Sequence, residues 1–301
     1  MVILKNMKKK EYKGLQLVST NRASWLYNPL NDRMITASQP LEDYLSTIDE
    51  KENPLHQFYI AKKQKQTLAN LHIISITLSN KKTGWIKKII SFLLSKNMIL
   101  LFFLLASILT ALISKDFATL NKTLSLYEII SLYIVFCFII IPLHEYSHFV
   151  IYDRYFNFSK IKFGFALRYL SLLVFFTKVP FYKLLTPAQK KATALAGIKM
   201  QIIIWAILAL CCNIYPNRFL FILITTNIGM LLINAIPFLK LDGYWVLSNL
   251  LHTTDYMEDF VQMIRGNLPK RPIILFVGFI NIGFIIFSFL WTLNKIINLF
   301  L

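Results

Sequence analysis

Long uncharged apolar stretches constrain this chain more than any other feature of its sequence. A helix crosses the hydrocarbon core of a bilayer with about 20 predominantly apolar residues. Mean hydropathy is +0.53 and 56% of the 301 residues are apolar, too much for a soluble domain of this size. The sequence therefore predicts a mainly α-helical, polytopic membrane protein. The predicted spans are residues 97–114, 125–150, 192–214, 219–239 and 272–294.

Basic residues are in large excess, with 33 lysines and arginines against 15 acidic residues and a formal net charge of +18. Such an excess indicates either nucleic-acid binding or the cytoplasmic basic bias of membrane proteins. If residues 1–97, 153–191 and 240–271 face the cytoplasm, they hold 28 of the 33 basic residues. Topology accounts for the charge, so the lipid bilayer is the expected partner and nucleic acid is not. The N-terminus is predicted to be cytoplasmic.

Residues 1–83 contain no stretch long enough to span a membrane, and they are predicted to form a small cytoplasmic α+β domain. In residues 25–37, WLYNPLNDRMITA, two strand-like pieces flank Asn-Pro and Asn-Asp turn residues, which predicts a hairpin. The following PLEDYLSTI, residues 40–48, predicts a helix. We interpret this part as a possible winged-helix-like module. Residues 84–301 are predicted to form the membrane domain.

Two further segments are too short or too charged to span a bilayer. Residues 84–95, GWIKKIISFLLS, predict either a basic helix lying on the membrane surface or a cytoplasmic extension of the next helix. Residues 163–177, FGFALRYLSLLVFFT, are apolar but interrupted by Arg168. We therefore expect this segment to form a membrane-associated, re-entrant or interfacial hairpin.

An HExxH motif, His144-Glu145-Tyr-Ser-His148, follows the second apolar stretch. Residues four apart share one face of a helix, so both imidazoles can meet one metal ion. Glu145 lies next to them, where it can accept a proton from water beside the metal. Ionisable groups in a membrane segment are costly unless they pair or bind an ion. The motif therefore predicts a metal site.

Catalytic zinc has three protein ligands and an open fourth position, so a third ligand is expected. Asp242 directly follows the fourth apolar stretch, and Pro237 and Gly243 interrupt that helix. Broken helices at membrane depth are tolerated where they line a polar cavity. The alternative is that Asp242 only caps the next helix. The competing candidates for the third ligand are Asp255, Glu258 and Asp259.

HEYSH and the later segment NAIPFLKLDGYW, residues 234–245, resemble the two motifs of the site-2 protease family of intramembrane zinc metalloproteases. The resemblance covers roughly residues 95–295. It implies a Zn2+ ion and Glu145 as the general base, and it associates Asn234 and Pro237 with substrate access. The metal ligands that it implies are His144, His148 and Asp242.

LDGYW and TPAQKKATALAGIKMQ, residues 186–201, are most similar to the branch described as peptide zinc metalloproteases, although a proline common in that branch is Ile198 here. The branch often accompanies peptide-modification and export proteins. The resemblance thus implies hydrolysis of a small peptide, leader or membrane-protein substrate. The expected location is a bacterial plasma membrane, with the active site near the cytoplasmic side. Two alternatives stay open: cleavage of a signalling protein, or a non-proteolytic zinc-binding immunity or transport component.

Overall fold

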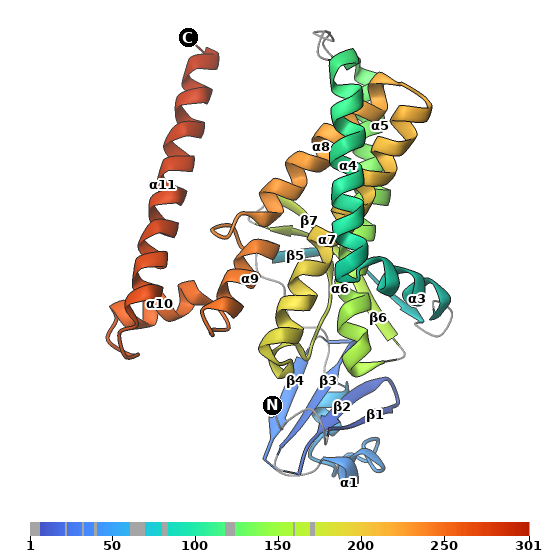
Figure 1. Ribbon diagram of the computed structural model, residues 1–301. Helices are drawn as coiled ribbons and strands as arrows, with labels where there is room; N and C mark the ends of the chain where they lie inside the picture. Colours follow the sequence, from blue (N-terminus) through green and yellow to red (C-terminus); the bar gives the residue numbers. More distant parts are fainter. Residues whose placement is uncertain are drawn as a thin grey trace. The chain divides into compact units, whose positions relative to one another are not determined.

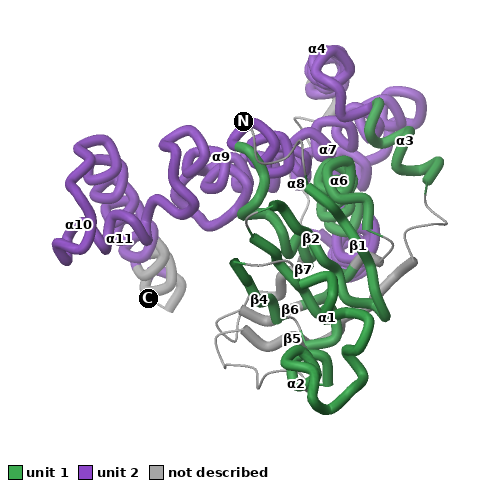
Figure 2. The backbone as a smooth tube through the Cα atoms, turned by 90° about the horizontal axis from the view of Figure 1, so that it is seen from below, with its two compact units in different colours: residues 1–92, 141–186 green, residues 93–140, 187–301 purple. Residues whose placement is uncertain are grey.

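The structure, a computed structural model, divides into two compact units (Figure 2). Unit 1 comprises residues 1–92 and 141–186, and unit 2 comprises residues 93–140 and 187–301. The N-terminal part therefore shares a unit with the helix that carries the HExxH motif. The structure describes residues 7–21, 23–31, 33–38, 41–60, 70–79, 84–117, 124–158, 160–168 and 172–300.

The chain is mainly helical (Figure 1). Among the described residues, five helical segments are long and apolar enough to cross a membrane. These segments are Lys96–Ser114, Leu126–Phe156, Pro187–Ile214, Arg218–Ala235 and Pro272–Trp291. Each of them overlaps one of the five predicted spans. Most side chains in the first, second and fifth segments are not buried, as expected of helices that face lipid.

Unit 2 is built from helices. Unit 2 contains α4 (Lys96–Phe117), α5 (Leu126–Val135), the π-helix η2 (Phe136–Ile140), α7 (Pro187–Ile214), α8 (Arg218–Ala235), α9 (Asp242–Leu250), α10 (Tyr256–Ile264) and α11 (Pro272–Phe300). Ser125 caps the N-terminus of α5. Its hydroxyl accepts a hydrogen bond from the Glu128 backbone N–H, and the Glu128 carboxylate accepts one from the Ser125 backbone N–H.

The fourth span is shorter than predicted. We expected it to reach residue 239, but α8 ends at Ala235, and Ile236 has the extended angles φ −63° and ψ 122°. The physical reason is Pro237, whose ring disfavours helical angles at the residue before it. The broken segment, residues 236–241, separates α8 from α9.

Unit 1 begins with a four-stranded antiparallel sheet in the order β1-β2-β3-β4. Its strands are β1 (Lys8–Tyr12), β2 (Leu15–Ser19), β3 (Ser24–Asn28) and β4 (Arg33–Ala37). Strands β3 and β4 form the predicted hairpin, and α1 (Glu42–Leu45) lies within the predicted helical segment. The short helix α2 (His56–Ile60) follows. The winged-helix interpretation stays a prediction.

A second antiparallel sheet, in the order β5-β6-β7, joins distant parts of unit 1. Strands β6 (Lys160–Arg168) and β7 (Leu172–Thr177) form a hairpin over most of the segment in which we expected one. The sequence did not reveal its partner β5 (Asn70–Ser79), which comes from the N-terminal part and pairs along the whole of β6. The predicted membrane association of this hairpin stays a prediction.

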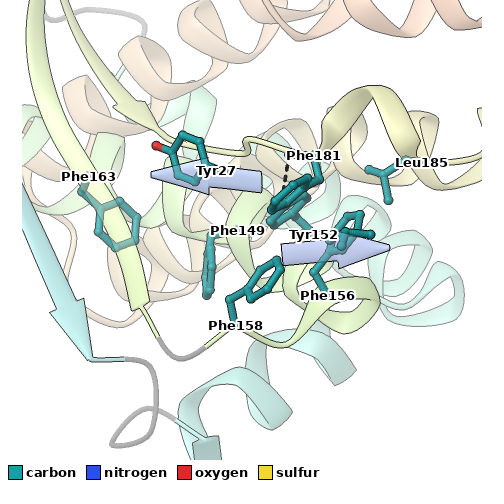
Figure 3. Packing of buried hydrophobic residues seen from close by; sticks show 9 residues of the cluster. Tyr27, Phe149, Tyr152, Phe156, Phe158, Phe163, Phe181 and Leu185 are labelled. Atoms are coloured by element: carbon teal, nitrogen blue, oxygen red, sulfur yellow. Dashed lines mark hydrogen bonds between the residues drawn. The ribbon is translucent and has the colours of Figure 1, made fainter. Parts of the chain in front are cut away.

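One of the buried clusters of unit 1 is mainly aromatic and packs around α6 (Ile141–Phe156), the helix that carries the HExxH motif. Figure 3 shows Phe149, Tyr152 and Phe156 of α6 gathered with Phe158 and Phe181. Tyr27 of the first sheet and Phe163 of the second belong to the same buried cluster. Both sheets are thus fixed to the motif helix by burial of large rings, which dominate core energetics.

Candidate metal centre

The two histidines of the motif lie one turn apart on α6 with their imidazoles facing each other. The Nε2 atoms of His144 and His148 are 3.3 Å apart, and the ring centroids are 5.0 Å apart. Two nitrogens bound to zinc at about 2.1 Å in a tetrahedral arrangement lie about 3.4 Å apart. The spacing of the two nitrogens therefore fits a shared metal ion.

Glu145 completes a group of three side chains that can hold a metal ion. One ligand atom from each of His144, Glu145 and His148 lies within 4.8 Å of the other two. His144 is buried with 4% of its surface exposed, and the other two residues are half-buried. Imidazole and carboxylate are the usual ligands of Zn2+ and other divalent transition metals, so the donor set fits the predicted metal.

Strand β7 holds Glu145 in place through one residue, Thr177. The Thr177 backbone N–H donates to Glu145 Oε2 at 3.2 Å, and its hydroxyl donates to the Glu145 backbone carbonyl at 3.0 Å. These two bonds orient both the carboxylate and the helix that carries it. Sequence reasoning missed Thr177, because nothing in an apolar hairpin indicates which residue reaches a glutamate 32 positions earlier.

The outer edge of β7 faces the metal group. Among the described residues, β7 is the last strand of its sheet, with β6 on one side. Lys178 donates its backbone N–H to Lys162 of the β6 side, whereas Thr177 donates away from β6 to Glu145. Backbone groups alternate in direction along a strand, so those of residues 173 and 175 also point outward. The edge beside Glu145 therefore offers backbone hydrogen-bonding groups.

Asp242, the predicted third ligand, lies in unit 2 as the first residue of α9. Only 9% of its surface is exposed. Leu241 occupies the capping position of α9 without a side-chain hydrogen bond, and Asp242 is the first residue inside the helix. Its role as a metal ligand stays a prediction.

The start of α9 is clamped against the end of α8. A Cβ atom added to Gly243 would lie 2.2 Å from the carbonyl oxygen of Ala235, which is far inside normal contact. Only glycine permits so close an approach of the two backbones. Gly243 therefore fixes where Asp242 stands relative to α8.

Two carbonyl groups of the broken segment before Asp242 accept hydrogen bonds from distant side chains. Tyr256 of α10 donates its hydroxyl to the Pro237 carbonyl at 2.9 Å, and Asn281 of α11 donates its amide to the Phe238 carbonyl at 3.0 Å. Asn281 also donates to the Tyr256 hydroxyl. Non-helical backbone at membrane depth requires such partners. Sequence reasoning missed both residues.

Asn234, which the resemblance associates with substrate access, is buried near the end of α8. Its side-chain amide donates to Gln201 Oε1 of α7 at 3.2 Å, and Asn227 donates to the Gln201 backbone carbonyl at 3.0 Å. The three side chains form a buried polar contact between two candidate spans. Gln201 was not singled out from the sequence.

Two of the three competing acidic residues, Asp255 and Asp259, are engaged in other contacts. Asp255 caps α10 by accepting from the amides of Met257 and Glu258, and its carboxylate pairs with Lys240 at 2.7 Å. Burial raises the pKa of Asp255, but hydrogen bonds from Lys240 and Tyr244 outweigh burial and leave the pKa below its ordinary value. Asp259 accepts from Thr253. Asp255 and Asp259 therefore have local structural roles.

No family model, curated protein or solved structure matches this chain. The candidate site therefore depends on the geometry of the chain's own residues.

Proposed function

We propose that the protein is an integral-membrane zinc metalloprotease of the site-2 class that hydrolyses a peptide bond. The observation that carries the proposal is the pair of facing imidazoles, with Nε2 atoms 3.3 Å apart, beside Glu145 in a candidate membrane span. Ionisable groups in such a segment are functional by default. Their arrangement supports zinc binding and acid–base chemistry at one place.

In the proposed site, His144 and His148 hold zinc, and Asp242 supplies the third ligand. Once bound, zinc would polarise the scissile carbonyl and make a water molecule more acidic. The break between α8 and α9 supports the role of Asp242, because it leaves a nearly buried carboxylate at the start of a helix whose cap is another residue.

Glu145 is the proposed general base. Its carboxylate accepts a proton as water oxygen attacks the carbonyl carbon, and the same proton passes to the leaving nitrogen when the C–N bond breaks. The Thr177 backbone N–H donates to Oε2 and helps to hold the carboxylate in one orientation. Thr177 therefore acts as a positioning residue.

The outward edge of β7 supports a peptide as the substrate. An extended peptide that pairs with this edge gains backbone hydrogen bonds, a recurring mode of peptide recognition. Pairing also keeps the scissile carbonyl exposed, whereas in a membrane helix that carbonyl is already bonded. Because Thr177 belongs to the same edge, the paired peptide would pass beside Glu145. We propose that the substrate is a small peptide or leader processed during maturation or export.

We propose that the site lies near the cytoplasmic face of a bacterial plasma membrane, as the resemblance implies. The distribution of basic residues supports the orientation, with a cytoplasmic N-terminus. Both alternative functions would use the same zinc site, but they differ in which protein, if any, is cleaved. A signalling protease would use the same residues on another membrane protein, and a non-proteolytic component would bind zinc without cleavage.

The test uses the full chain reconstituted in nanodiscs, with zinc content measured by mass spectrometry and cleavage by a quenched-fluorescent peptide library. We expect one zinc per chain, retained in Glu145→Gln with loss of cleavage. His148→Ala and Asp242→Ala should lose zinc, whereas the matched control His252→Ala, exposed in the turn after α9, should keep it. Zinc binding without cleavage by the wild-type chain would favour the non-proteolytic alternative.

A further inference from the structure

Helix α3 (Gly84–Leu93) has one face that is apolar and uncovered. Trp85, Ile89 and Phe92 are 66%, 50% and 63% exposed. Their spacing of four and three residues places them in one stripe along the helix. Ile90, on another face, is buried. The large apolar side chains thus point away from the protein, an arrangement that marks an interaction surface.

The orientation of α3 is fixed by its attachment to α6. Lys87 forms a 2.6 Å ion pair with Asp153, and Arg154 donates to the Ser91 carbonyl at 2.7 Å. The exposed fractions of the Lys87 and Asp153 side chains are 18% and 4%, so this pair is largely shielded from water. A shielded pair of this kind is costly to break. The apolar stripe is therefore held outward by two contacts on the helix that carries the HExxH motif.

The chain next to α3 indicates what covers the stripe. Turn residues at Leu94 and Ser95 separate α3 from α4, so α3 is an independent helix rather than an extension of the following one. The first candidate membrane span begins at Lys96, directly after this turn. A helix joined so closely to a membrane span reaches the lipid surface. Lys88 and Lys96 are exposed and suit anionic headgroups.

We propose that α3 lies in the interfacial region of an anionic bilayer, with Trp85, Ile89 and Phe92 inserted at the boundary between headgroups and acyl chains. Tryptophan is enriched at this depth because its ring is both apolar and polar. Helices with an apolar stripe and basic residues bind such surfaces. The inference depends on residence in a bilayer and not on the proposed reaction.

Because α3 is attached to α6, the position of α3 in the membrane affects the position of the candidate metal site. Asp153, the contact point of α3, lies five residues beyond His148 and nine beyond His144. At about 1.5 Å per residue, the two histidines are about 8 and 14 Å along the helix axis from that contact. A helix α3 fixed at the headgroup level thereby sets the depth of the HExxH motif below the membrane surface.

The experiment measures tryptophan fluorescence of the full chain in nanodiscs that contain anionic phosphatidylglycerol and brominated acyl chains. Subtracting the emission of Trp85→Phe from that of the wild type isolates Trp85. The same subtraction with Trp291→Phe isolates Trp291 in a candidate span, which is the positive control. The subtraction with Trp25→Phe isolates Trp25 in β3, which is the negative control. None of the three measurements needs zinc or a substrate.

We expect bromine to quench Trp85 as strongly as Trp291, with bromine near the headgroups more effective than bromine deep in the chains. Acrylamide, a water-soluble quencher, should have little effect on Trp85. Two results would overturn the proposal. Quenching of Trp85 by acrylamide alone would place the stripe in water, and emission resistant to both quenchers would indicate that protein covers it.

Discussion

Replacing Gly243 by alanine tests whether the clamp between α8 and α9 positions Asp242. The new Cβ atom would meet three backbone atoms of Ala235 and Ile236, at 2.2, 2.6 and 3.0 Å. Backbone atoms cannot rotate away as a flexible side chain can. Normal contact begins at 3.4 Å, so the start of α9 must move by about 1 Å from the end of α8.

The size of the effect follows from this displacement. Overpacking of this kind costs roughly 1–3 kcal/mol of stability. Displacing the support of a metal ligand typically lowers metal affinity about 10- to 100-fold. We therefore expect Gly243→Ala to weaken zinc binding in that range, which corresponds to about 1.4–2.7 kcal/mol. The change acts through Asp242, the neighbouring residue.

The assay is competition of the reconstituted protein with a chelator of known zinc affinity, supported by the visible spectrum of the Co2+-substituted protein. Gly229→Ala is the matched control, because it lies within α8 and a Cβ added there meets nothing within 4 Å. Alanine is favoured over glycine in a helix by about 1 kcal/mol, so this variant should bind zinc as the wild type does.

Equal zinc affinity in Gly243→Ala and Gly229→Ala would contradict this prediction, provided that Asp242→Ala loses zinc. It would mean that the approach of the two backbones does not position the ligand. If Asp242→Ala itself keeps full zinc affinity, the error lies earlier, in the choice of the third ligand.

Three further predictions concern the surroundings of the site. Asn281→Leu and Tyr256→Phe should each lower stability by about 1–3 kcal/mol, because both side chains donate to the broken segment. Their effects should be non-additive, because the two side chains also contact each other. Denaturation of the wild type, the two single variants and the double variant measures both quantities. Asp255 has a lowered pKa, so its stabilisation is complete above its ordinary pKa and is lost as the pH falls through the folded-state pKa. The free energy of unfolding should therefore fall less steeply with acidification in Asp255→Asn than in the wild type. Lys87→Met should lower stability by about 3–5 kcal/mol because it removes the shielded ion pair with Asp153, and Lys87→Met/Asp153→Leu should recover part of that loss in thermal unfolding.

The features that the sequence predicted are those encoded by neighbouring residues. Apolar length identified the five candidate spans, and the spacing of His144 and His148 placed both imidazoles on one helical face. Pro237 and Gly243 indicated a broken helix, although the position of its end was misjudged by four residues. Each of these inferences depends on hydropathy, helical period or backbone sterics, all of which act within a few residues.

Long-range packing within each unit determines which distant groups support Glu145, the broken segment and Asp153. Thr177 reaches Glu145 across 32 residues, Asn281 reaches the broken segment across 43, and Lys87 reaches Asp153 across 66. Strand β5 adds a third strand to the hairpin that was predicted for residues 163–177. Such contacts carry no local signal, because any threonine, asparagine or lysine can donate a hydrogen bond. Packing within each unit selects the few side chains that come within reach of the candidate metal ligands in unit 1 and of the broken segment in unit 2.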